Sequence, residues 1–131
     1  MKALSKRVGW LVVSFLVLAV PAVAADAPKV LSVIAVKVKG DQSAYLQKVK
    51  QLDAIQKRLE TGGTLRVWRA TAAGQSTGTI YVGIEYPTLE AYAKAATKLQ
   101  ADGEATKFLK ELDASGLREV ISNSLLVEIT P

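Results

Sequence analysis

Four stretches of the chain carry the hydrophobic pattern of β-strands, with apolar residues recurring at every second position. The first is rich in valine and isoleucine and is apolar on both faces for most of its length, which is typical of a central strand covered on both sides. The predicted strands are Val30–Lys39, Thr64–Thr71, Thr79–Tyr86 and Val120–Ile129. In the last strand, alternation puts Ile121, Leu125, Val127 and Ile129 on one face and Val120, Ser122, Ser124 and Leu126 on the other. Turn-forming residues at 73–77 predict that the second and third strands form a hairpin.

Three further stretches repeat their apolar residues at spacings of three and four, as amphipathic helices do. The predicted helices are Ala44–Glu60, Leu89–Ala101 and Glu104–Leu112. Asp41 or Ser43 can cap the first helix, and Thr88 can cap the second. The apolar stripe of the second helix is narrow and rich in alanine, which permits close approach to a sheet. The first helix is expected to stop at Gly62 and Gly63, since glycine takes the left-handed conformation without a steric clash.

The order of these elements, β-α-β-β-α-(α)-β, predicts an α+β fold of the ferredoxin-like, split βαβ kind. Its right-handed crossovers place the helices on one face of a four-stranded antiparallel sheet. The other face then has no cover, although it carries apolar side chains. Because burying such a face gains about 25 cal/mol per Å², we expect a homodimer that packs two sheets together.

The first 24 residues have the organisation of a signal peptide. Three basic residues open the chain, and the apolar run Trp10–Val20 follows them. Small residues at 22–24 predict cleavage after Ala24, with Ala25 as the alternative, and leave one domain at 25–131. An uncleaved anchor is the other interpretation, but the run is about 11 residues long where a spanning helix needs roughly 20. The sequence therefore predicts export to the periplasm or the medium.

Composition excludes several classes of function. The chain has 17 basic and 12 acidic residues, but three of the basic ones belong to the predicted signal, which leaves a net charge of +2. The lysines of the first helix are interspersed with Asp53 and Glu60, unlike the basic stripe of a nucleic-acid-binding surface. There is no histidine and no cysteine, so the usual ligands of zinc, copper and haem iron are absent, and neither a metal nor a cofactor is expected. Ser122 and Ser124 have no histidine to activate them, which excludes serine-hydrolase chemistry.

Two segments resemble the dimeric α+β barrel superfamily, which includes the small antibiotic-biosynthesis-monooxygenase-like domains. They are GTIYVGIEYPTLEAYAKA, where a strand runs through Pro-Thr into a helix, and the short helix EATKFLKEL. The resemblance implies a sheet-on-sheet dimer with a ligand pocket in each subunit between the sheet and the helices. Some members are cofactor-independent oxygenases of aromatic substrates, some isomerise lactones, some degrade haem and some have no assigned activity. The haem-binding branches use a histidine, which this chain lacks.

Five residues are candidates for a ligand site, each with a structural alternative: Trp68, Asn123, Arg66, Tyr81 and Glu85. Trp68 can stack an aromatic ligand, or it can belong to the core or the dimer interface. Arg66, like Arg69, can clamp a carboxylate, or it can form an exposed ion pair. Asn123 is either a buried amide that needs partners or a strand residue bonded to water.

Glu85 can act as a base if an apolar setting raises the pKa of its carboxyl group, or it can lie at the rim of the sheet beside Lys37 or Lys39. Tyr81 is expected to pack with its hydroxyl at an edge. No residue can be assigned a catalytic role from the sequence.

Three functions follow from these features. The first is a non-catalytic module that binds a small apolar or aromatic molecule. The second is a cofactor-independent oxygenase or isomerase that uses Asn123, Trp68 and one arginine. The third is a structural dimer of the envelope. Convergence of Asn123, Trp68 and Arg66 on one cavity would favour the enzyme.

Overall fold

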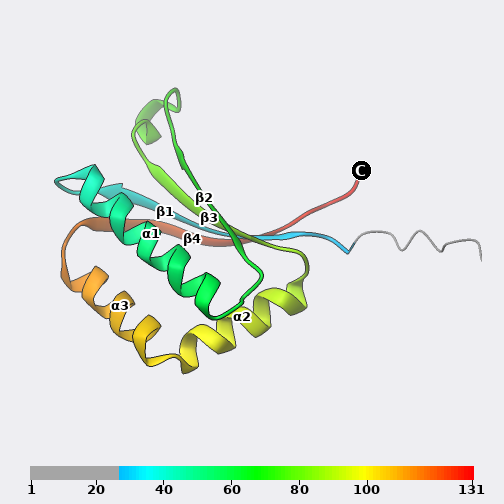
Figure 1. The fold of residues 1–131 in the computed structure, drawn as a ribbon. Coiled ribbons are helices and arrows are strands. Elements are labelled where there is room, and N and C mark those ends of the chain that lie inside the picture. Colours follow the sequence, from blue (N-terminus) through cyan, green and yellow to red (C-terminus); the bar gives the residue numbers. More distant parts are fainter. Residues whose placement is uncertain (1–26) are drawn as a thin grey trace, which may run out of the picture.

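The computed structural model describes residues 27–131 (Figure 1). The predicted signal peptide, 1–24, lies outside the described residues. The elements are β1 (Val30–Val38), α1 (Gln42–Arg58), β2 (Thr64–Arg69), a 3₁₀ turn (Gly74–Ser76), β3 (Ile80–Tyr86), α2 (Leu89–Ala101), α3 (Gly103–Ala114) and β4 (Arg118–Val127). All four predicted strands and all three predicted helices are present in the predicted order.

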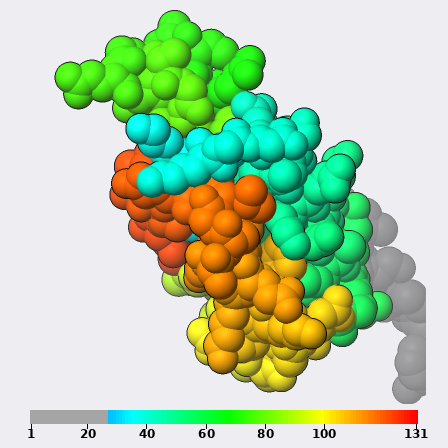
Figure 2. Space-filling view, turned by 90° about the vertical axis from the view of Figure 1, so that its left-hand side faces the viewer, coloured from blue at the N-terminus to red at the C-terminus, as the bar shows by residue number. Residues whose placement is uncertain are grey.

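The strands form one antiparallel sheet in the order β2-β3-β1-β4, and the three helices lie on one side of it (Figure 1). This is the predicted ferredoxin-like α+β arrangement. The turn between β2 and β3 stands away from the rest of the molecule (Figures 1 and 2). We call the side without helices the open face. Its strand residues are Leu31, Val33, Ala35, Lys37, Thr64, Arg66, Trp68, Tyr81, Gly83, Glu85, Glu119, Ser122, Ser124 and Leu126.

The hydrophobic core fills the space between the sheet and the helices. Its buried members are Val36, Tyr45, Val49, Ile55, Ile80, Val82, Ala105, Phe108 and Leu112. From α2, only Ala95 is fully buried, and Leu89, a member of the predicted stripe, is 55% exposed. The central strand β1 is covered by helices on one side only. On the other side Leu31 and Val33 remain half-buried, so the prediction of cover on both sides is wrong for the isolated chain.

Side-chain caps fix where the helices begin. Asp41 rather than Ser43 caps α1, because its carboxylate accepts from the backbone N–H of Ser43 at 2.9 Å. Thr88 caps α2 as predicted and accepts from the N–H of Ala91 at 3.0 Å. Asp102 ends α2 and caps α3, since its carboxylate accepts from Ala105 at 2.9 Å.

The end of α1 differs from the prediction. The helix ends at Arg58, and Glu60, not a glycine, takes the first left-handed conformation with a φ of 51°. Lys98 of α2 donates to the carbonyl oxygens of Leu59 and Glu60 at 3.2 and 3.1 Å, which satisfies two of the acceptors that a helix end leaves free. Tertiary contacts therefore help to end this helix before the glycines do.

A buried polar cluster joins the end of α1 to the end of β3. The Thr61 hydroxyl donates to the Gln56 side chain, and Gln56 also hydrogen-bonds Tyr86. All three residues are less than 10% exposed. Burial raises the pKa of the Tyr86 hydroxyl above its ordinary value, while the hydrogen bond with Gln56 acts in the opposite direction. The sequence analysis did not single out this cluster.

A β-bulge changes the faces of β4. Ala35 pairs with Ser122, but the next residue of β1, Val36, pairs with Val120, so Ile121 is an extra residue on β4. Val120 consequently shares the helix side with Asn123 and Leu125, and the predicted division of this strand is wrong at Val120 and Ile121. A bulge has no reliable pattern in one sequence, because it depends on how the partner strand pairs.

Gly63 lies where a side chain cannot fit. A Cβ atom there would lie 2.6 Å from Cγ2 of Ile84 and 2.9 Å from Cε1 of the buried Tyr86. We therefore expect Gly63→Ala to lower the free energy of unfolding by about 1–3 kcal/mol through overpacking, measured by urea denaturation. Gly103→Ala is the matched control, because no atom lies within 4 Å of its Cβ position. Equal stabilities of the two variants would contradict this role of Gly63.

Candidate functional site

Four of the five candidate residues share the open face. Trp68 on β2 is paired with Tyr81 on β3, and Arg66 is paired with Gly83. Glu85 lies two residues further along β3 on the same face. Strand pairing thus places Arg66, Trp68, Tyr81 and Glu85 on two neighbouring strands.

Asn123 lies apart from this group. It pairs with Ile34, which packs against the core, so it belongs to the helix side of the sheet. Its strand, β4, is the edge opposite to β2. Asn123 is exposed, and its side chain makes no hydrogen bond to any residue within 27–131, so it is not a buried amide. Asn123, Trp68 and Arg66 therefore do not converge on one cavity.

The indole of Trp68 lies over Gly83. A Cβ atom at Gly83 would be 2.7 Å from Cζ3 and 3.2 Å from Cη2 of Trp68, and 3.2 Å from Cδ1 of Leu31. The six-membered ring therefore reaches across β3 towards β1, and only glycine leaves room for it there. The Trp68 residue remains 45% exposed, so part of the aromatic surface is open to solvent.

Arg66 stands beside this ring. Its partner across the strands is Gly83, whose position the Trp68 ring covers. Arg66 is exposed and makes no ion pair with any of residues 27–131. Arg69 is paired with Ile80 and lies on the helix side of the same strand. The two arginines thus differ in their surroundings although they are three residues apart.

Glu85 lies at the rim of the sheet, where it pairs with Lys29 and not with Lys37 or Lys39. Its carboxylate is 3.6 Å from Nζ of Lys29, whereas Lys39 pairs with Glu119 at 3.3 Å. The Glu85 side chain is 38% exposed. The carboxylate is thus solvated and ion-paired and does not have the apolar setting expected of a general base.

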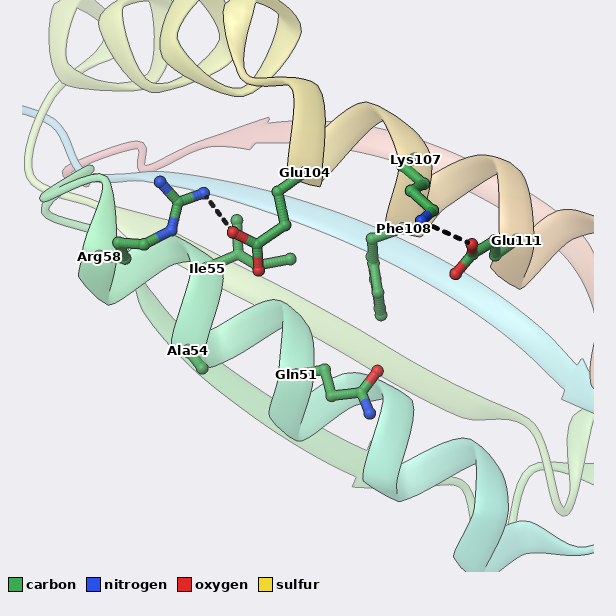
Figure 3. A pocket seen from close by; sticks show the side chains of 8 residues that line it. All are labelled: Gln51, Ala54, Ile55, Arg58, Glu104, Lys107, Phe108 and Glu111. Atoms are coloured by element: carbon green, nitrogen blue, oxygen red, sulfur yellow. Dashed lines mark ion pairs between the residues drawn. The ribbon is translucent and has the colours of Figure 1, made fainter.

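The side chains of the core lie between the sheet and the helices in the described part of the chain. A surface cleft of about 420 Å³ lies instead between α1 and α3, with Ile55 and Phe108 among its lining residues (Figure 3). This cleft is not the pocket between the sheet and the helices that the resemblance implies.

The charges along this cleft are already paired. Nη2 of Arg58 lies 2.6 Å from the Asp102 carboxylate. It also lies 2.9 Å from the Glu104 carboxylate, and Lys107 pairs with Glu111 at 3.8 Å (Figure 3). The hydrogen bond from Arg58, followed by that from the Ala105 N–H, lowers the pKa of Asp102 below its usual value. We interpret this cleft as a structural junction of α1 with α3, because Arg58 and Lys107 are both paired with acids of the same chain.

Two further properties of residues 27–131 concern metal binding and membrane insertion. They contain no group of three acidic side chains placed to hold a metal ion. None of the helices in this range is both long and apolar enough to cross a membrane.

The sequence analysis missed the role of Gly83. A glycine inside a strand weakens it and often marks close approach of another group, so Gly83 within IYVGIEY was the available signal. What could not be read was which side chain approaches, because this depends on the pairing of β2 with β3.

Comparisons with known proteins agree on the fold. No family model matches the chain, and the search of curated proteins found no significant relative. Among solved structures, the cofactor-independent oxygenase SnoaB from Streptomyces nogalater superposes with a TM-score of 0.60 at 15% identity, over 80% of this chain and 97% of its own. The fold is shared. The ferredoxin-like architecture inferred from the sequence is confirmed.

Two further structures have the same arrangement. A NIPSNAP family protein from Agrobacterium tumefaciens gives a TM-score of 0.59 at 17% identity, over 80% of this chain and 88% of its own. A dimeric ferredoxin-like protein from an uncultured marine organism gives 0.50 at 14% identity, over 81% and 92%. At such identities the similarity establishes the fold and not the activity.

Proposed function

We propose that this chain is an exported homodimer that binds a small apolar or aromatic molecule on its open face and has no catalytic role. The observation that carries the proposal is the exposed indole of Trp68, held over Gly83 among other residues of that face. An aromatic surface fixed on a sheet can stack with a flat ligand at little cost in side-chain entropy.

The distribution of apolar side chains supports a dimer. Leu126 on the open face is 53% exposed, and Leu31 and Val33 lie beside it on the neighbouring strand β1. Contiguous apolar surface of this kind marks interaction sites on proteins. A second copy is the occupant we propose, and one solved neighbour is described as dimeric.

The apolar surface continues from the open face around the edge strand β4. On the helix side of β4, Val120, Leu125 and Val127 are each exposed by about half. A stable interface buries about 800 Å² of accessible surface on each partner. We therefore propose that the partner covers the β1–β4 part of the open face together with the edge of β4, and that the β2–β3 part, with Trp68, is left for the ligand.

Binding is favoured over catalysis by where the polar residues lie. The three residues of the proposed oxygenase set are split between opposite edges and opposite faces of the sheet. Glu85 is neutralised by Lys29. The oxygenase SnoaB shares the fold at 15% identity, which does not transfer its activity. A purely structural envelope dimer remains the competing role, and it differs in having no ligand.

Export is part of the proposal, and it rests on the basic and apolar segments that precede Ala24. Expressed in a Gram-negative host, the protein is expected in the periplasmic fraction with a mass that begins at Ala25. Intact mass spectrometry of that fraction measures this. Full-length protein retained in the membrane fraction would instead support the anchor.

The dimer can be tested by placing a charge on the open face. Leu126→Arg is expected to shift the protein from dimer to monomer, because the guanidinium group would be buried without a partner between two sheets. Light scattering after size-exclusion chromatography measures the mass. Leu109→Arg is the control, since Leu109 is an exposed apolar residue of α3, on the helix layer. A monomeric parent protein, or equal dissociation of both variants, would refute the interface.

Ligand binding can be tested with a neutral aromatic probe, naphthalene-2-carboxamide. Trp68 and Trp10 are the only tryptophans, so a chain with Trp10→Phe gives a single indole N–H resonance. Addition of the probe is expected to shift this resonance saturably. Gly83→Ala keeps the reporter but displaces the ring, and it should weaken binding roughly fivefold, as loss of an aromatic contact does.

Gly103→Ala, which alters no contact, serves as the control for this titration. A dimer whose indole resonance does not move up to the solubility limit of the probe would leave the structural role as the better explanation. The same holds if Gly83→Ala binds the probe as tightly as the parent.

A further inference from the structure

We propose that the ligand is a planar aromatic carboxylate, with its ring on Trp68 and its carboxylate on Arg66. This inference rests on the proposed function and names the chemical class that the site takes. It is carried by two independent features of the open face: the position of Arg66 beside the indole, and the balance of charge around it.

Strand geometry brings the two groups together. Arg66 and Trp68 are two residues apart on one strand and share a face, so their Cα atoms are about 6.6 Å apart. The Trp68 ring leans away from its own partner Tyr81 and covers Gly83, which is the partner of Arg66. The arginine side chain therefore rises next to the six-membered ring. An acid group attached directly to an aromatic ring spans such a separation.

The charges of the open face favour an anion. Its strands carry two carboxylates, and both are paired: Glu85 with Lys29 and Glu119 with Lys39. Arg66 and Lys37, by contrast, have no ion-pair partner among residues 27–131. Glu128, just beyond β4, is at the opposite edge of the sheet from Arg66. Glu85 lies diagonally across from Arg66 on β3, but its carboxylate pairs with Lys29, so the guanidinium beside the indole has no ion-pair partner among residues 27–131.

Arginine suits this task better than a lysine would. Its planar guanidinium offers parallel N–H donors that match the two oxygens of a carboxylate. Such a charge-assisted contact is stronger than a hydrogen bond between neutral groups. The flat indole of Trp68 beside the guanidinium of Arg66 favours a flat molecule that bears an acid group at its edge.

The test compares naphthalene-2-carboxylate with its neutral carboxamide, using the indole N–H resonance of Trp68 in the full chain with Trp10→Phe. The carboxylate is expected to bind roughly fivefold more tightly, which is the size of effect that a partly exposed ion pair gives. Arg66→Gln should remove this preference and leave binding of the carboxamide unchanged. Arg69→Gln is the matched control, because it removes the same charge from the helix side of the same strand.

The outcomes separate the two proposals. Equal affinities for both probes, or a preference that Arg69→Gln abolishes as much as Arg66→Gln does, would overturn the assignment of Arg66 while aromatic binding stands. If neither probe moves the indole resonance, the ligand site itself is absent and both proposals fail. A preference lost only in Arg66→Gln supports the inference.

Discussion

A four-stranded sheet with one layer of helices must leave its other side to be covered by something else, and this constraint governs the rest of the molecule. The helices and the sheet pack tightly on the covered side, where Tyr45, Ile80 and Val36 are 2% exposed or less. That side is occupied by the side chains of the core. Any binding surface of the sheet is therefore the open face, which has strand residues but no second layer.

The arrangement of the open face depends on the lack of a side chain at Gly83. With a Cβ at position 83, the ring of Trp68 would have to leave the sheet. Gly63 plays the corresponding part on the covered side, where it admits the ring of Tyr86 and the methyl group of Ile84. The two glycines are thus positions of close approach, one against the solvent-exposed aromatic and one against the core.

A single extra residue in the edge strand β4 changes the side of the sheet on which a neighbouring residue lies. The bulge at Ile121 turns Val120 to the helix side, while Asn123 and Leu125 keep the pairing that places them there. Because the helices do not reach over this edge, Asn123 is solvated and cannot join the polar residues of β2 and β3. A site that would need an amide beside Trp68 is excluded by topology, whereas a site built from Trp68 and Arg66 is permitted by it.

The sequence by itself determined the order of the elements and most of their bounds. It determined the cap at Thr88 and the alternation of side chains along β2 and β3, and it narrowed the cap of α1 to Asp41 or Ser43. These follow from local spacing, which does not depend on distant residues. It also determined that Arg66 and Trp68 share a face. Only the tertiary structure decided that the indole covers Gly83, that Lys29 neutralises Glu85, and that Asn123 lies on the other side of the sheet. Each of these depends on the register between strands far apart in the chain, and a register is fixed by the packing of the whole sheet rather than by any one segment.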